Sequence, residues 1–200
     1  TAPVWGSTPL VVTLHDIIFL EKQAGRTTSL YQSLGRQYRR LVVPRILPKC
    51  RRIITVSQFE CDRIRTALGL DPERIVAIHN GYNPRFRPMD GTAEVTKRYL
   101  PDAEYLFFLG NTDPKKNTPG TLRTYAEYVR RSERPLPLLV ADLPMQAAES
   151  ILQQIGEPEL MDRLRLPGYI PNGDLPAVYN GASAFLYTSL RESFGIPQLE

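Results

Sequence analysis

The sequence predicts a protein of the α/β class, in which parallel sheets are built from alternating strands and helices. Three observations lead to this prediction. Short runs of β-branched and other apolar residues recur along the 200-residue chain, as buried strands require. Segments with helical character separate these runs, and some of them open with an N-cap residue and end at a glycine. Strand and helix therefore alternate in both halves, which is the pattern of a doubly wound parallel sheet.

The first half of the chain is expected to supply three strands and two helices. Its strands are three apolar runs, at 10–14, 52–56 and 75–78. The helix between the first two strands covers 29–47, and Pro44 is expected to divide it because proline lacks an amide hydrogen. The next helix opens with a capping box of Ser57 and Glu60, and it stops at Gly69.

The second half continues the alternation after a segment rich in proline, arginine and glycine. We place the domain boundary there, with one domain over 1–88 and the other over 89–200, because the net charge changes sign. The expected strands are 105–109, 137–141, 164–167 and 184–187. The expected helices are 94–100, 118–131, 147–155 and 174–180. Asp174 is expected to cap the last of these, and a further helix is expected to begin at 195–200.

Composition narrows the classes of function. Apolar residues make up 42% of the chain, which is enough for a packed core. No run of 18 apolar residues occurs and the N-terminus lacks the features of a signal peptide, so we expect no membrane span. Cys50 and Cys61 have no cluster of histidines nearby, and we interpret them as free thiols. A cytoplasmic protein is expected.

Charge is distributed unevenly along the chain. Residues 1–90 contain 14 Lys and Arg against 7 Asp and Glu, whereas residues 91–200 contain 11 against 14. The segment 36–52 has seven cations and no acidic residue. Two readings of this segment stay open: a solvated helix face, or a peripheral contact with the inner face of an anionic membrane. Nucleic acid is not expected as a partner, because no aromatic-rich or helix-turn-helix pattern accompanies the cations.

The segment 189–200 carries the best candidate for a ligand site. A strand ends, a loop with Gly195 follows, and the expected helix has Pro197 in its first turn. Free amides at such a helix start favour phosphate. Glu192 stands before the helix and Glu200 within it, and carboxylates accept hydrogen bonds from the paired hydroxyls of a ribose or hexose. We expect both to line a crevice at the carboxyl ends of the strands.

Glu192 and Glu200 are separated by seven residues that include Phe-Gly-Ile-Pro. This spacing resembles the Glu-x7-Glu motif of retaining glycosyltransferases with the GT-B fold, in particular glycosyltransferase family 4. Other segments resemble that family in the same order, over nearly the whole chain: Leu-His-Asp-Ile-Ile-Phe, Ile-Ile-Thr-Val-Ser-Gln-Phe, His-Asn-Gly-Tyr-Asn, Gly-Asn-Thr-Asp-Pro-Lys-Lys-Asn and Pro-Gly-Tyr-Ile-Pro-Asn-Gly-Asp-Leu-Pro. The resemblance implies two Rossmann-like domains, both incomplete in this chain: the end of an acceptor-side domain and the start of a donor domain.

The resemblance also implies roles for residues near the second glutamate. Glu200 would hold the ribose of the donor nucleotide, and Glu192 would contact the donor sugar as a catalytic residue. The backbone amides of Phe194, Gly195 and Ile196 would cradle the sugar and the diphosphate.

Further roles fall on the loop after the strand at 105–109 and on the first domain. Lys116 matches a lysine that binds the donor diphosphate in the family. Gly110 and Asn111 fall in the same donor-binding loop, where many members have arginine in place of Asn111, and Lys115 is a candidate to replace that cation. His15 matches a position that faces the transferred sugar, and we include it with Glu192 as a candidate catalytic residue.

The function implied is retaining transfer of a hexose, mannose-like in the first place, from a nucleoside-diphosphate sugar to a saccharide or lipid-linked acceptor in glycan biosynthesis. The nucleotide sugar is a substrate, and no cofactor is expected. No metal is expected either, because Asp-x-Asp is absent and helix-start amides with Lys116 would stabilise the leaving group. Two other functions stay open: a nucleotide-sugar epimerase and a non-catalytic nucleotide-sugar-binding module.

Overall fold

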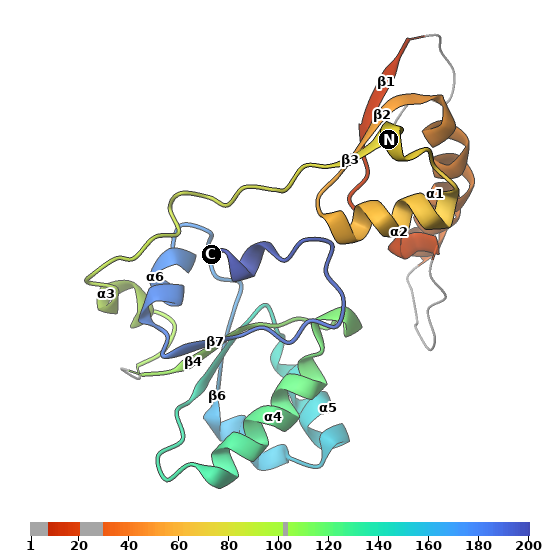
Figure 1. Ribbon diagram of the computed structural model, residues 1–200. Coiled ribbons are helices and arrows are strands. Elements are labelled where there is room, and N and C mark those ends of the chain that lie inside the picture. Colours follow the sequence, from red (N-terminus) through yellow and green to blue (C-terminus); the bar gives the residue numbers. More distant parts are fainter. Residues whose placement is uncertain (1–7, 21–29, 102–103) are drawn as a thin grey trace. The chain divides into compact units, whose positions relative to one another are not determined.

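The computed structural model describes residues 8–20, 30–101 and 104–200. The chain divides into two compact units (Figure 1). The first unit comprises Thr1–Gly81 with Ser193–Gly195, and the second comprises Tyr82–Glu192 with Ile196–Glu200. The domain boundary at residues 88 and 89 stays a prediction from composition.

The first unit contains a parallel sheet of three strands in the order β1-β2-β3. Its strands are β1 (Leu10–Thr13), β2 (Cys50–Thr55) and β3 (Ile75–Ala77). Two helices connect them, α1 (Leu30–Ile46) and α2 (Gln58–Leu68). Three short 3₁₀ helices accompany these elements, η1 (Ile18–Leu20), η2 (Leu47–Lys49) and η3 (Pro72–Arg74). Strand–helix–strand therefore occurs twice, as the sequence predicts.

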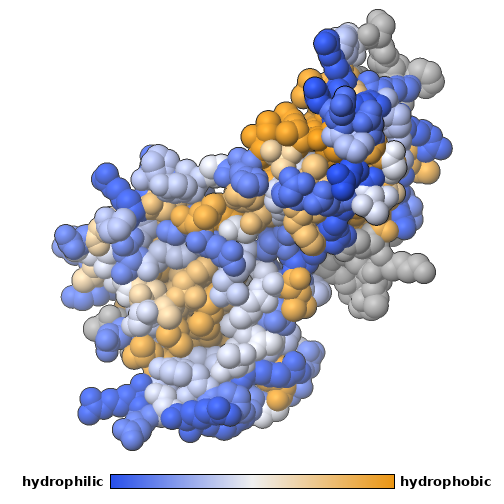
Figure 2. Space-filling view, in the orientation of Figure 1, coloured by the Kyte–Doolittle hydropathy of each residue, from blue (hydrophilic) through white to orange (hydrophobic). Residues whose placement is uncertain are grey.

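The two faces of this first sheet differ. Ile53 and Ile75 are buried in one core cluster with Ile46 of α1 and Ile64 of α2, so the helices cover one face. On the opposite face, Val11 and Val76 are 60% and 42% exposed, and Ile78, just after β3, is also exposed. Figure 2 shows apolar side chains at the surface of this unit. Parallel sheets are normally covered on both faces. Among the described residues, by contrast, the face with Val11 and Val76 is open.

Local sequence signals in the first unit have mixed outcomes. The Ser57 hydroxyl accepts a hydrogen bond from the Glu60 amide at 3.2 Å, and Gly69 ends α2 with a φ of +59°, both as predicted. The expected division of the first helix at Pro44 is wrong, because α1 continues through Pro44 to Ile46. Only the last turn follows the proline, and the buried Ile46 and Leu47 anchor that turn in the core. Cys50 and Cys61 are free and buried, as predicted.

The second unit contains a parallel sheet of four strands in the order β6-β5-β4-β7. The strands are β4 (Leu106–Leu109), β5 (Leu138–Ala141), β6 (Leu164–Gly168) and β7 (Ala184–Leu186). The helices are α3 (Ala93–Thr96), α4 (Thr118–Arg131), α5 (Met145–Ile155) and α6 (Leu175–Gly181). The short 3₁₀ helices are η4 (Pro114–Lys116), η5 (Pro158–Arg163) and η6 (Ile196–Gln198).

Both faces of the second sheet are covered, because alternate strand residues pack in two separate cores. Phe108 and Val140 pack with residues of α4 and α5 in one core. Phe107 and Leu139 pack in the other, which includes Val178 of α6. The Tyr105 hydroxyl donates to the Val178 carbonyl at 2.7 Å, which ties α6 to the start of β4. This second unit is therefore doubly wound, as predicted.

Two details of the second unit differ from expectation. Asp174 stands at the N-cap position of α6, as predicted, but its side chain makes no capping hydrogen bond. Its carboxylate instead accepts from Arg98 at 3.1 Å and from the hydroxyl of Tyr99, so it ties α6 to the segment after α3. The helix expected at 195–200 is the short 3₁₀ helix η6, closed by the Leu199 amide donating to the Ile196 carbonyl at 2.8 Å.

Candidate functional site

Two loops meet where the strand order of the second sheet reverses. The chain runs outward from the central β4 to β5 and β6, and then returns to β7 on the other side of β4. In open parallel sheets, the carboxyl ends of the two strands at such a reversal form the crevice where ligands bind. The loop after β4 and the loop after β7 lie at this position, so the topology alone identifies the place to look for a site.

Hydrogen bonds between residues close in the chain fix the shape of the loop after β4. Gly110 begins it, and a Cβ there would lie 2.9 Å from side-chain atoms of both Phe108 and Val140, so only glycine fits. The Asn111 side chain accepts from the Asp113 amide at 2.8 Å, and the Asp113 side chain accepts from the Lys115 amide at 3.1 Å. The loop thus has a defined shape up to Lys116.

Lys116 and Glu192 form an ion pair where the loops after β4 and β7 meet. The Lys116 Nζ donates to Glu192 Oε1 at 2.8 Å, and the two side chains are only 19% and 24% exposed. The ammonium also lies 6.0 Å from the centre of the Tyr187 ring, within the range of a cation–π contact. The structure therefore brings together two residues that the sequence predicts separately.

The pairing with Lys116 affects the pKa of Glu192. Burial raises the pKa of Glu192, but hydrogen bonds from Lys116 and Ser189 and the charges of Lys116 and Lys115 outweigh burial, so the pKa is lowered. Burial, with the nearby Glu192, raises the pKa of Tyr187 to about 12. At neutral pH Glu192 is therefore a carboxylate and Tyr187 a neutral phenol.

Three residues that the sequence reasoning missed link the two loops. The Asn117 side-chain amide donates to the Thr188 carbonyl at 3.3 Å, and the hydroxyls of Thr121 and Thr188 are 2.5 Å apart. The Leu190 amide also donates to the Lys115 carbonyl at 2.8 Å. The one sequence signal for Asn117 is its place before the predicted helix at 118–131, where N-cap residues occur.

Glu200 lies beside a pocket of the second unit. Tyr179 Oη donates to Glu200 Oε2 at 3.5 Å. Burial raises the pKa of Glu200, and the hydrogen bond from Tyr179 partly offsets this. The pocket has a volume of about 480 Å³, and aromatic and polar side chains share its lining, among them Phe86, Arg87, Asn180 and Glu200.

The remaining predicted residues take different places. His15 is an exposed side chain just after β1 in the first unit. Phe194 and Gly195 are also grouped with the first unit, and Gly195 is buried with a φ of +90°, a conformation that favours glycine. Ile196 begins η6 and is 37% exposed. The ligand-binding and catalytic roles of all the site residues stay predictions.

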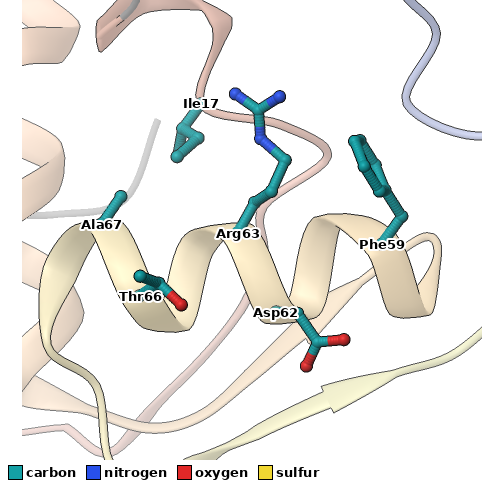
Figure 3. Close-up of a pocket in the computed structure, with 6 residues that line it drawn as sticks. All are labelled: Ile17, Phe59, Asp62, Arg63, Thr66 and Ala67. Carbon is teal, nitrogen blue, oxygen red and sulfur yellow. The ribbon is translucent and has the colours of Figure 1, made fainter.

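A second pocket, of about 440 Å³, lies along α2 in the first unit (Figure 3). Its lining is mostly apolar, with one acidic and one basic side chain: Ile17, Phe59, Asp62, Arg63, Thr66 and Ala67. The guanidinium of Arg63 lies 5.5 Å from the centre of the Phe59 ring. None of the residues predicted for the site lines this pocket.

The described residues contain neither a candidate metal site nor a candidate membrane span. Within 8–20, 30–101 and 104–200, no three His, Cys, Asp or Glu side chains gather closely enough to hold a metal ion. Nor does any helix in the same part of the chain combine the length and apolarity of a membrane span.

Comparison with known proteins gives consistent matches. An O-antigen chain mannosyltransferase B of Escherichia coli is 28% identical over 95% of this chain. The chain spans 49% of that relative's length, so it corresponds to about half of the protein it matches.

Solved structures agree on the fold. The crystal structure of Anabaena Alr3699/HepE in complex with UDP and glucose matches 94% of this chain and 48% of its own, with a TM-score of 0.66 and 17% identity. The sucrose-phosphate synthase of Thermosynechococcus elongatus matches 94% of this chain and 46% of its own, with a TM-score of 0.71 and 20% identity. The fold is GT-B, with parallel sheets in two Rossmann-like parts.

Family patterns cover both halves of the chain. Glycosyltransferase Family 4 matches residues 2–86, and Glycosyl transferases group 1 matches residues 95–200, which is more than half of the chain. With the doubly wound sheet, these matches identify the chain as a member of the group 1 glycosyl transferases.

Proposed function

We propose that the protein containing this chain is a retaining glycosyltransferase that moves a hexose from a nucleoside-diphosphate sugar to a saccharide or lipid-linked acceptor. The observation that carries the proposal is the Lys116–Glu192 pair, at 2.8 Å, where the loops after β4 and β7 meet. A cation beside a carboxylate is the combination that a charged diphosphate joined to a hydroxyl-rich sugar needs. The mannosyltransferase among the relatives favours a mannose-like hexose.

Most of the predicted donor-site residues have a place in this proposal. Lys116 would bind the diphosphate, with Lys115 adding positive charge from the same loop. Glu192 would accept hydrogen bonds from the sugar hydroxyls, and Glu200 from the ribose. The amides of Phe194, Gly195 and Ile196 would cradle the sugar and the diphosphate, and the φ of +90° at Gly195 is a conformation that glycine adopts without strain.

The chemical step would retain the configuration at the transferred carbon. The bond from that carbon to the diphosphate breaks, and Lys116 and the backbone amides of the donor site stabilise the negative charge that develops on the phosphate. The acceptor hydroxyl attacks on the face that the leaving group vacates, and a phosphate oxygen takes its proton. This sequence needs no protein nucleophile, and we propose that it needs no metal.

The acceptor side of the proposal rests on helix α1. Leu34, Tyr38 and Leu41 are exposed by 70%, 48% and 57%, and they are spaced three and four residues apart on one face. Exposed cations, including Arg39, Arg40 and Arg45, accompany them. We propose that this face contacts an anionic membrane surface from the cytoplasm, where a lipid-linked acceptor would be presented.

The test measures release of nucleoside diphosphate from several nucleotide sugars by the full-length protein, with and without a panel of saccharide and lipid-linked acceptors. Release that depends on an acceptor, with product of retained configuration by NMR, is the expected result. Binding of the sugar nucleotide without release would favour a non-catalytic binding module. Conversion of the donor sugar into its epimer, without transfer, would favour an epimerase.

A further inference from the structure

Gly120 is an unexpected residue in the first turn of α4. Glycine disfavours a helix relative to alanine, and the φ of Gly120 is not among the positive values that require glycine. The reason is a close contact. A Cβ at Gly120 would meet the side-chain amide of Asn117, with Nδ2 only 2.6 Å away. The absence of a side chain at Gly120 therefore makes room for the Asn117 amide.

Asn117 uses this seat to link the two loops of the crevice. It has a φ of +57°, which turns the chain from η4 into α4. From there its side-chain amide donates to the Thr188 carbonyl at 3.3 Å. Its own carbonyl accepts from the amide and hydroxyl of the buried Thr121, at 2.9 and 3.1 Å. The Thr121 hydroxyl lies 2.5 Å from that of Thr188, so two separate hydrogen bonds link the loops.

These contacts lie directly beside the ion pair. Asn117 follows Lys116 in the chain, and Thr188 lies four residues before Glu192. We propose that Asn117, seated on Gly120, is a positioning residue that holds the loop after β7 against the loop after β4 and so keeps Lys116 and Glu192 paired. The link to donor binding rests on the proposed function, whereas the pairing itself can be measured without any ligand.

Two single variants and their combination test the seat. Asn117→Gly removes the amide and keeps the left-handed backbone without strain. Gly120→Ala displaces the same amide while favouring the helix, so it should fold at least as well as the parent. Because both act through one contact, the double variant should be no worse than either single variant. Thr124→Val is the control, since it removes a hydrogen bond of 3.0 Å to the Gly120 carbonyl on the exposed side of α4 and leaves the Asn117 side chain unchanged.

The first readout is the titration of the Glu192 carboxyl, followed by carbon NMR in the full-length protein without ligand. Asn117→Gly and Gly120→Ala should both raise its pKa toward that of an ordinary glutamate. Lys116→Met, which removes the partner itself, should also raise this pKa and serves as the reference. Thr124→Val should leave the titration unchanged. A Glu192 titration that neither variant moves would overturn the proposal, as would shifts that add up in the double variant.

The second readout is calorimetric binding of a nucleoside diphosphate and of the matching nucleoside. Loss of one hydrogen bond that holds the loops should weaken diphosphate binding by about threefold to tenfold. The nucleoside should bind as before. Equal weakening of both ligands would contradict a role confined to the ion pair. If the parent binds neither ligand, the proposed function fails, while the Glu192 titration still decides whether Asn117 positions the pair.

Discussion

Lys116 and Glu192 are 76 positions apart in the chain, yet the loops after β4 and β7 bring them into one ion pair. Their side chains are mostly buried but still reach solvent. The pair is therefore intermediate between an exposed ion pair, which contributes little to stability, and a buried pair that has lost all contact with water. The ammonium of Lys116 has three hydrogens to donate. It can therefore keep its bond to Glu192 while it donates to a phosphate.

The first prediction concerns Lys116. Changing Lys116 to Met should weaken binding of a nucleoside diphosphate far more than binding of the nucleoside, because only the former carries charge opposite the ammonium. Diphosphate binding by the parent should also fall as salt is added, since partly exposed charges are screened. Calorimetry at two salt concentrations measures both effects, with Arg123→Met on the exposed face of α4 as the charge-matched control. Equal losses for the two ligands would place Lys116 away from the diphosphate.

The second prediction concerns pH and Glu192. The folded pKa of this carboxyl lies below its ordinary value of 4.5, so the unfolded state binds the proton more readily. The ion pair therefore stabilises the fold fully above pH 4.5, and this contribution is lost as pH falls through the lower folded pKa. Glu192→Gln should reduce the free energy of unfolding by about 1 kcal/mol at pH 7.

The measurement is urea unfolding of the parent and Glu192→Gln proteins across acid and neutral pH. The difference in unfolding free energy should be largest at neutral pH and should shrink below pH 4.5. A difference that stays constant over this range would mean that the ionised Glu192 contributes nothing specific. Glu149→Gln, at an exposed position of α5, serves as the control.

Individual residues show what a local pattern can predict. Ser57, Glu60 and Gly69 were predicted to bound one helix, and they do, because capping bonds join residues only a few positions apart. Asp174 takes the predicted N-cap position of α6, but its side chain accepts from Tyr99, 75 positions away, and no local pattern predicts that bond. Asn117 was missed for the same reason, since Thr188 is 71 positions from it. Contacts of that span depend on the strand order.

At the scale of elements, α1 shows why an apolar pattern needs a structure to assign its faces. The sequence places apolar residues among the cations of 36–52 but does not say which of them reach the core. The structure separates two groups. Val42, Val43 and Ile46 belong to the core cluster of the first unit, whereas Tyr38 and Leu41 are exposed. An exposed apolar stripe flanked by cations is typical of helices that lie on a membrane surface.

The third prediction follows from this stripe. The full-length protein should sediment with anionic vesicles at low salt and not with neutral ones, because each Lys or Arg near such a surface contributes about 1 kcal/mol. Changing Arg39, Arg40 and Arg45 to Gln should abolish sedimentation, and changing Leu34 and Leu41 to Ser should reduce it. The control changes Arg123, Arg131 and Arg134 of the second unit to Gln, with the same loss of charge. Equal sedimentation of parent and Arg39/Arg40/Arg45 variant would leave this face as a solvated helix surface.

At the scale of the whole molecule, alternation of strand and helix was enough to predict two parallel sheets. It did not predict that β4 lies between β5 and β7 in the second sheet. The strand order depends on whether each connection places the next strand on one side of the sheet or the other. That order decides which loops meet, and so it decides where the crevice lies. The last turn of the chain also differs from prediction, since Ile196–Gln198 form a 3₁₀ helix. A phosphate there would meet the amides of one short turn.

The last prediction concerns the reaction as a whole. A diphosphate leaving group needs positive charge, and enzymes supply it either with a metal ion or with side chains and backbone amides. In the proposed site, side chains would supply this charge through Lys116, which pairs with Glu192 at 2.8 Å, and through Lys115 in the same loop. We therefore expect transfer by the full-length protein to continue when a chelator removes divalent ions, and to fall steeply in Lys116→Met whether or not magnesium is present. The assay is nucleoside diphosphate release with acceptor, before and after chelation, with magnesium or manganese then added back. Release that stops on chelation and returns with either ion would show that a metal supplies the charge, and Lys116 would then need a different role.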